Sequence, residues 1–464
     1  MSTNAGAAST GIIDPSINPD AAPGGRRLGL PIAIALVVGN MIGAGIFVLP
    51  AALAPYGNNA IIGWLITIAG SMCLAFTLAS LASRIPGGPF AYVETAFGPE
   101  AGFVVMWSYL ISIWSANAAL PIAAVSNFSS VWPSLGGAIA PLLAVAFVWI
   151  LTLVNAQGAR TAGLVSLIAS VLKALPLIVV ALVAAAYLGR GGHPAARADV
   201  PISLGFVAGA AALSIFPMVG FESATLLVGK IRNPERAVPL ATVIGTGLTG
   251  LIYLAATWAV FYMLPSNKAA MSASPFADAI RPSIGSAAGS AIAIFAAISA
   301  LGALNGWILC SGEVPLTLAR DGVFPAWFGR TTRIGTPLRA QIVAAVAASL
   351  LIMSNYTRSL TGLFAFMTLI STVAALVLYA ACAGAALKLL ARGAIGGILL
   401  AILAATGLIF ALWSFWGAGL EPTLWGAGLL ATGLPIWWVM RRNRRSAKGG
   451  SNPPAAANPI SPPE

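Results

Sequence analysis

The chain has 464 residues, of which 59% are hydrophobic and only 8% are charged. An ordinary soluble domain carries about 25% charged residues, so this composition excludes a water-soluble globular protein. The formal net charge of +12 does not indicate a nucleic-acid-binding surface. Such a surface gathers its basic residues on one face, whereas here they fall between apolar segments.

Apolar segments of about 20 residues recur along the chain, each long enough to cross a hydrocarbon core of about 30 Å as a helix. A transmembrane β-barrel would instead alternate apolar and polar residues. We therefore predict an all-α polytopic membrane protein with about 12 transmembrane helices. The predicted spans are 30–54, 60–83, 101–124, 138–156, 162–188, 204–229, 238–263, 285–312, 338–354, 361–388, 394–414 and 423–440.

The basic residues are divided unevenly between the two ends of these spans. With the N-terminus inside, eighteen of the 24 Lys and Arg residues fall on the cytoplasmic side and five on the opposite side. This asymmetry predicts a cytoplasmic (inner) membrane protein with both termini in the cytoplasm. Arg26 and Arg27 precede an apolar run, as in a signal peptide, but the run is too long and more spans follow it, so we expect it to be retained.

The sequence offers no constellation for catalysis or for binding a cofactor. Cys73, Cys310 and Cys382 all fall within predicted spans, where a thiol packs as a small apolar group, and His193 is the only histidine. We therefore expect no metal site, no cofactor and no enzyme activity. A channel is disfavoured because the sequence has neither a pore-lining charge ring nor a repeated filter loop. An amino-acid-sensing membrane receptor stays open as an alternative.

Two predicted spans contain helix-breaking residues near their middle. Gly39, Gly43 and Gly45 lie in the first span, and Pro217 is followed by Gly220 in the sixth. Close helix contacts would also explain the glycines, but unwound backbone at this depth is tolerated only where it lines a cavity. Paired broken helices indicate an inverted-repeat transporter with a midplane site. Amides after the first break suit a carboxylate and carbonyls before it suit an ammonium group.

Three further side chains inside spans point to function. Lys173 and Glu222 are ionisable, which costs at least ~2.5 kcal/mol at that depth. Burial disfavours a charged lysine, so Lys173 is a candidate for proton coupling, with a permanently charged structural role or snorkelling as alternatives. Glu222 acts either as a gating residue or as a structural residue that forms a hydrogen bond with the backbone opened by the break in the sixth span. Trp307 has a ring that can hold an alkylammonium group by cation–π attraction, although a packing role is the alternative.

Several motifs resemble those of the amino acid, polyamine and organocation transporter superfamily, and within it bacterial basic amino acid/polyamine antiporters such as arginine/agmatine exchangers. The resemblance covers nearly the whole chain, from about Leu28 to Arg442. Its motifs are Gly39–Phe47 (Gly-Asn-x-x-Gly-x-Gly-x-Phe), Pro86–Tyr92 with Phe97-Gly98, Gly220–Ser223 followed by Asn233–Pro239, and Ala319–Pro325.

The resemblance implies a LeuT-type fold of two five-helix inverted repeats plus two extra helices, with spans 1 and 6 broken. The implied division is a disordered cytoplasmic tail at 1–25, the first repeat at 26–190, the second at 200–390, spans 11 and 12 at 391–442, and a basic, then disordered, cytoplasmic tail at 443–464. The oligomeric state stays open, a homodimer included.

The resemblance further implies secondary active transport of amino acids by alternating access, with basic amino acids or their amine products as substrates. Transport would proceed by exchange or proton coupling, without sodium. A neutral amino acid/proton symporter and a polyamine permease are the alternatives. The implied partners are the small-molecule substrate and the lipid bilayer, and not nucleic acid.

The same resemblance assigns the binding residues. The backbone from Asn40 to Gly45 would bind the carboxylate and amino group of the substrate. The predicted substrate site comprises Asn40, Met41, Ile42, Gly43, Ala44, Gly45, Tyr109, Ile113, Asn117, Phe216, Val219 and Trp307, with Lys173 and Glu222 as gating or proton-coupling residues. Ala44 stands where the exchangers have a serine, and Phe216 where they have a gating tryptophan, so the exact substrate and the gate do not carry over.

Overall fold

A computed structural model describes residues 29–43, 45–157, 173, 176–222 and 233–449. Within these ranges all regular elements are α-helices or short 3₁₀ helices, and eight helices are long and apolar enough to cross a membrane. The long elements are α3 (Asn59–Ala82), α5 (Pro99–Ser129), α6 (Ala140–Ala156), α9 (Pro234–Met263), α12 (Ser286–Arg320), α14 (Leu360–Ala391), α15 (Ile398–Ala418) and the pair α16 (Leu420–Ala431) and α17 (Gly433–Gly449). The predicted all-α polytopic membrane fold is confirmed.

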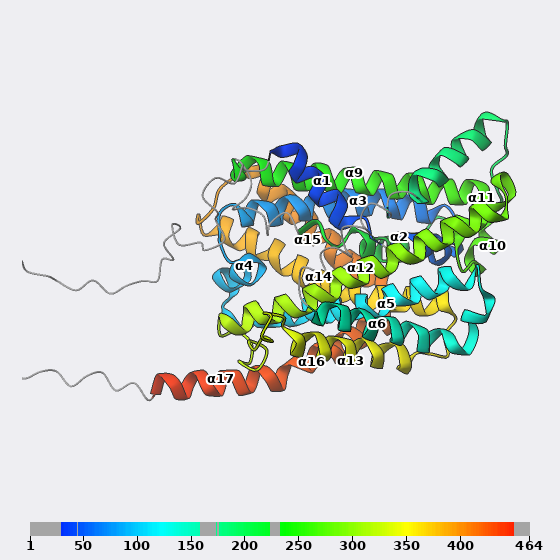
Figure 1. The fold of residues 1–464 in the computed structure, drawn as a ribbon. Coiled ribbons are helices and arrows are strands. Elements are labelled where there is room, and N and C mark those ends of the chain that lie inside the picture. Colours follow the sequence, from blue (N-terminus) through cyan, green and yellow to red (C-terminus); the bar gives the residue numbers. More distant parts are fainter. Residues whose placement is uncertain (1–28, 44, 158–172, 174–175, 223–232, 450–464) are drawn as a thin grey trace, which may run out of the picture.

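Shorter helices complete the bundle. The apolar ones are α1 (Leu30–Met41), α2 (Gly45–Leu53), Pro176–Gly189, α8 (Leu204–Ile215) and α13 (Leu338–Ser354). The others are α4 (Gly88–Phe97), α10 (Ser266–Met271), α11 (Pro275–Ile284) and the 3₁₀ turns η1 (Ala54–Tyr56), η2 (Pro133–Leu135), η3 (Gly137–Ile139) and η4 (Phe216–Met218). In Figure 1 the long helices run roughly parallel, α4 lies at one end of the bundle and α10 and α11 lie at the other.

Helices α5 and α14 form the centre of the bundle. Their apolar windows are 89% and 78% buried, against 11% for the window across α16 and α17, so the last two helices lie at the periphery. Serines join the central pair: Ser108 donates 2.8 Å to the carbonyl of Ala374, and the hydroxyls of Ser112 and Ser371 lie 3.1 Å apart. Inside a lipid bilayer the hydrophobic effect does not favour contact between helices. Helices there associate instead through close packing of small residues and through hydrogen bonds between side chains.

The observed helices differ from the predicted spans in several places. Helices α4, α10 and α11 are not predicted, because each is too short to span a bilayer. Helix α12 runs eight residues beyond its predicted end, to Arg320, and the predicted span 423–440 is divided at Thr432 into α16 and α17. Helix α17 also extends to Gly449, into the predicted disordered tail. The tail at 1–25 and most of the first half of the predicted span 162–188 lie outside the described residues, and the total of 12 spans stays a prediction.

Candidate functional site

The first predicted helix break is present. Helix α1 ends at Met41, and α2 begins only at Gly45. Between them Ile42 adopts an extended backbone, with φ −63° and ψ 100°, and its N–H still donates to the carbonyl of Val38. The break therefore opens carbonyls at the end of α1 and amides at the start of α2, and Met41 and Ile42 around it are buried.

A tyrosine from α9 bridges this break. The hydroxyl of Tyr253 donates a 2.7 Å hydrogen bond to the carbonyl oxygen of Met41 and accepts one of 3.2 Å from the N–H of Gly43. Its ring is fully buried and lies 5.9 Å from the ring of Trp64 in α3. Unpaired backbone groups at membrane depth cost several kcal/mol each, so Tyr253 stabilises the unwound backbone and defines its shape.

A second interruption follows α8. The α-helix ends at Ile215, and η4 continues it for one tight turn through Pro217. Val219 then becomes extended, and Gly220 has a φ of +118°, a conformation that glycine adopts without strain. The chain is described again from residue 233, so the further course of the predicted sixth span lies outside the described residues.

The two interruptions touch each other. A Cβ atom built on Gly45 would lie 2.8 Å from Cδ1 of Phe216, so the phenyl ring packs directly on the start of α2. The same ring packs edge-on against Phe364 of α14, with centroids 6.2 Å apart. Helix α12 closes a third side, because a Cβ on Gly43 would lie 4.0 Å from that of Ala303.

Helix α5 presents Tyr109, Ile113 and Asn117 on one face, since four-residue spacing places side chains one above another. Ile113 and Asn117 are fully buried. Neither the amide oxygen nor the amide nitrogen of Asn117 has a hydrogen-bond partner among the described residues. A buried amide without partners is costly. On α12, half-buried Trp307 packs against the cluster that contains Phe216.

Glu222 lies at the centre of a hydrogen-bonded group. The hydroxyls of Tyr109 on α5 and Tyr379 on α14 each donate to one carboxylate oxygen at 3.1 Å. The N–H of Gly220 donates to the carboxylate at 3.0 Å. The predicted bond to backbone opened by the break is thus present, together with two side-chain bonds that the sequence did not reveal. Glu222 therefore ties the second interruption to α5 and α14.

The remaining predicted residues are placed less completely. Val219 is buried beside η4, and its N–H donates to the carbonyls of Ile215 and Phe216. Lys173 is only 7% exposed, but residues 158–172 and 174–175 around it lie outside the described residues. Ala44 and the side chain of Asn40 also lie outside them.

Tyr253 and Tyr379 are the site residues that sequence reasoning missed. Tyrosine favours the membrane interfaces, so its position far inside a predicted span is the signal that was available. Asn305, next to Gly306 and Trp307 in α12, joins this helix to a neighbouring one. Its amide oxygen accepts a 2.8 Å hydrogen bond from Asn155 of α6 and joins two helices.

A polytopic helical bundle in which the unwound segment between α1 and α2 packs on the irregular end of α8 is the arrangement of a secondary transporter with discontinuous helices. Residues 28–439 match the family model described as amino acid permease. The chain belongs to the amino acid permease family, a family of transporters rather than enzymes, as the motifs predict.

Curated relatives agree with this assignment. The chain is 35% identical over 335 residues to a cadaverine/lysine antiporter of Escherichia coli (strain K12), covering 71% of this chain and 74% of the relative. It is 30% identical over 457 residues to a putative arginine/ornithine antiporter of Bacillus subtilis (strain 168), covering 89% and 96%. It is 29% identical over 365 residues to the putrescine transporter PotE of Escherichia coli (strain K12), covering 76% and 82%.

Proposed function

We propose that this protein exchanges basic amino acids or their amine products across the cytoplasmic membrane by alternating access. The observation that carries the proposal is the contact between the two interruptions, where Gly45 packs on Phe216. Unwound backbone near the middle of the membrane has free N–H and C=O groups. These groups supply partial positive and negative charges to a substrate without an ionised side chain. The names of the relatives, which include lysine, cadaverine, arginine, ornithine and putrescine, support a cationic substrate.

In this proposal the backbone around the first break binds the α-amino and α-carboxylate groups of an amino acid. Amides at the start of α2 bind the carboxylate, and carbonyls at the end of α1 bind the ammonium group. Asn117 and Trp307 then contact the side chain. The unpartnered amide of Asn117 gains hydrogen bonds on binding, and the face of Trp307 attracts the distal cation by about 1–2 kcal/mol.

Glu222 acts as the gate. Its bonds to Tyr109 and Tyr379 join the second interruption to two central helices, so a change in these bonds alters how the elements around the site are held together. Lys173 is the candidate for proton coupling, because it is a buried ionisable group in a predicted span. Neither role requires sodium.

The proposed arrangement in the membrane follows the charge asymmetry. Residues 26–190 and 200–390 form the two inverted repeats, 391–442 add two helices, and both termini lie in the cytoplasm. The end of the bundle with α4 is then cytoplasmic, and the end with α10 and α11 faces outward (Figure 1). A homodimer is the oligomeric state that we propose.

Counterflow in proteoliposomes tests this function. Vesicles loaded with lysine, arginine, ornithine, cadaverine or putrescine should take up the same labelled compounds with saturation, and external leucine should not compete. Trp307→Leu should weaken uptake of cationic substrates about 5- to 30-fold. Trp438→Leu is the matched control, because Trp438 is 58% exposed on α17. Uptake of leucine without a counter-substrate would support the neutral symporter, and binding without uptake would support the receptor.

A further inference from the structure

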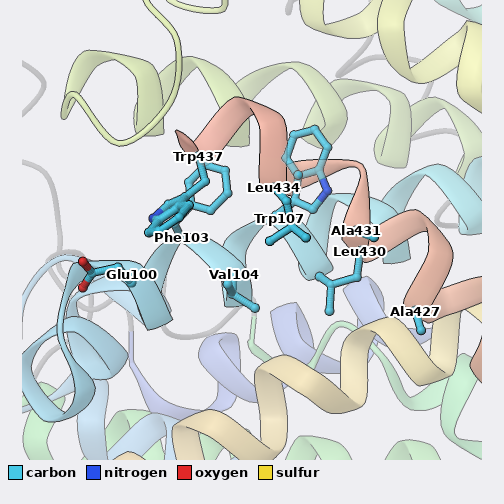
Figure 2. Close-up of a pocket in the computed structure, with 10 residues that line it drawn as sticks. Glu100, Phe103, Val104, Trp107, Ala427, Leu430, Ala431, Leu434 and Trp437 are labelled. Atoms are coloured by element: carbon cyan, nitrogen blue, oxygen red, sulfur yellow. The ribbon is translucent and has the colours of Figure 1, made fainter. Parts of the chain in front are cut away.

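A separate apolar groove lies on the outside of the bundle, between the start of α5 and the corner that joins α16 to α17. Figure 2 shows its walls, which come from Phe103 and Trp107 on one side and from Leu430, Leu434 and Trp437 on the other. The cavity measures about 370 Å³. Its walls belong partly to the least buried of the spanning helices, so the groove opens towards the surrounding membrane.

The packing around Trp107 fixes one wall of this groove. The indole N–H of Trp107 donates to the carbonyl of Leu429 at 3.4 Å, and its ring stacks on Phe103 with centroids 6.2 Å apart. Gly433 at the helix corner makes room for the ring, because a Cβ there would lie only 2.5 Å from Trp107 Cδ1. The groove is therefore a defined surface of the fold, built from residues more than 300 positions apart.

Positive charge begins where the groove ends. Arg441 lies one helical turn beyond Trp437, and its guanidinium carbon is 5.0 Å from the centroid of that indole ring. Helix α17 then continues through a basic run that consists of Arg442, Arg444, Arg445 and Lys448. The residues that line the groove include one carboxylate, that of Glu100. An apolar groove with the Arg441 cation at its end, at the start of a basic stretch of sequence, is complementary to an acyl chain that carries an anionic head group.

We propose that this groove and the start of the basic run bind one anionic phospholipid. One acyl chain lies along Phe103, Trp107 and Leu434, and the phosphate lies near Arg441. Basic residues next to a transmembrane helix attract anionic lipids, and tryptophans sit at the level of the head groups. A second copy of this chain fits the groove less well, because an isologous dimer centred here would bring two basic runs together.

The test uses the delipidated full-length protein in detergent, with native mass spectrometry and melting temperature as readouts. The lipids are phosphatidylglycerol, phosphatidylcholine and phosphatidylethanolamine with identical acyl chains. We expect phosphatidylglycerol to remain bound at one equivalent, at least fivefold more tightly than either zwitterionic lipid, and to raise the melting temperature. Equal binding of phosphatidylcholine would overturn the proposal.

Three variants locate the site. Arg441→Gln and Ala431→Trp should each weaken phosphatidylglycerol binding at least fivefold, because one removes a cation and the other places a ring across the groove. Arg236→Gln, at the start of α9, should leave it unchanged. Unchanged binding in both groove variants would contradict the site. The proposal would also be contradicted if Ala431→Trp abolished a dimer but still bound the lipid. The groove would then be an interface between two copies of the chain.

Glu100 decides between two kinds of phospholipid. Its carboxylate repels a phosphate but attracts an ethanolamine ammonium group. With an anionic lipid as the ligand, Glu100→Gln should maintain or strengthen phosphatidylglycerol binding. If phosphatidylethanolamine binds as tightly as phosphatidylglycerol and Glu100→Gln weakens it, the ligand is an aminophospholipid and the proposal for an anionic lipid is wrong.

Discussion

The hydroxyl of Tyr253 donates a 2.7 Å hydrogen bond to the carbonyl oxygen of Met41, the last residue of α1. The same hydroxyl accepts the N–H of Gly43, so one phenol satisfies backbone groups on both sides of Ile42. The unwound segment thereby gains a fixed shape before any substrate binds. Pre-organisation of this kind reduces the ordering cost of binding.

Tyr253→Phe removes both bonds and retains the ring that packs against Trp64. Two hydrogen bonds of about 1 kcal/mol each predict a loss in substrate affinity of about 10-fold or more. Binding isotherms on the purified protein provide the measurement. Tyr262→Phe is the control, because the hydroxyl of Tyr262, near the end of α9, donates a hydrogen bond to the carbonyl of Gly192, which follows the helix Pro176–Gly189. Equal affinity in Tyr253→Phe and wild type would remove Tyr253 from the site.

The two glycines of the first break differ in the space around them. A Cβ on Gly45 would lie 2.8 Å from the Phe216 ring, whereas the nearest atom to a Cβ on Gly43 is 3.6 Å away. We expect Gly45→Ala to reduce transport at least 10-fold and Gly43→Ala to have a small effect. Adding Phe216→Ala to Gly45→Ala should restore part of the activity. Uptake assays at matched expression measure these three variants and Phe216→Ala alone, and purely additive effects in the double mutant would contradict the contact.

Asn117 provides a test in which stability and function change in opposite directions. Its buried amide has no partner in the described residues, so Asn117→Leu should maintain or raise the melting temperature, since an unsatisfied buried group costs about 1–3 kcal/mol. Substrate affinity should fall about 10-fold. Asn155→Leu is the control: it breaks the bond to Asn305 and should lower the melting temperature. A parallel loss of stability in Asn117→Leu would indicate a packing role.

The gate proposal concerns the two tyrosines that bond Glu222. Glu222→Gln keeps the shape of the side chain but removes the charge that strengthens these hydrogen bonds. We expect coupled exchange to fall about 10-fold and efflux into substrate-free buffer to rise, with substrate affinity changed less than about twofold. Tyr109→Phe and Tyr379→Phe should show smaller changes in the same direction. Unaltered efflux in all three variants would leave the group as a packing feature.

Lys173 is tested by its effect on energy coupling. If it is the coupling site, an inward proton gradient should drive accumulation of substrate in proteoliposomes, and sodium should have no effect. Lys173→Ala should retain exchange but lose this accumulation, because exchange needs no net proton movement. Accumulation that persists in the folded variant would exclude the coupling role. Inactivity with a lower melting temperature would support the structural one.

Local sequence was sufficient for much of the fold. Apolar length predicted the spanning helices, and the glycines around Gly43, like the pair Pro217 and Gly220, predicted the interruptions, because helix stability depends on neighbouring residues. The burial of Glu222 and Lys173 was predictable in the same way, since each lies in a long apolar run of the sequence. These features require no knowledge of which helices are neighbours.

Only the tertiary structure decided the contacts that complete the site. Tyr253 and Met41 are 212 residues apart, and Tyr379 lies 157 residues from Glu222. Hydrophobic patterns cannot pair such residues, because most faces of a membrane helix are equally apolar whether they meet lipid or protein. Which tyrosine satisfies which unwound or charged group follows from helix packing, and the packing of α5 against the corner at Gly433 created the outer groove in the same way.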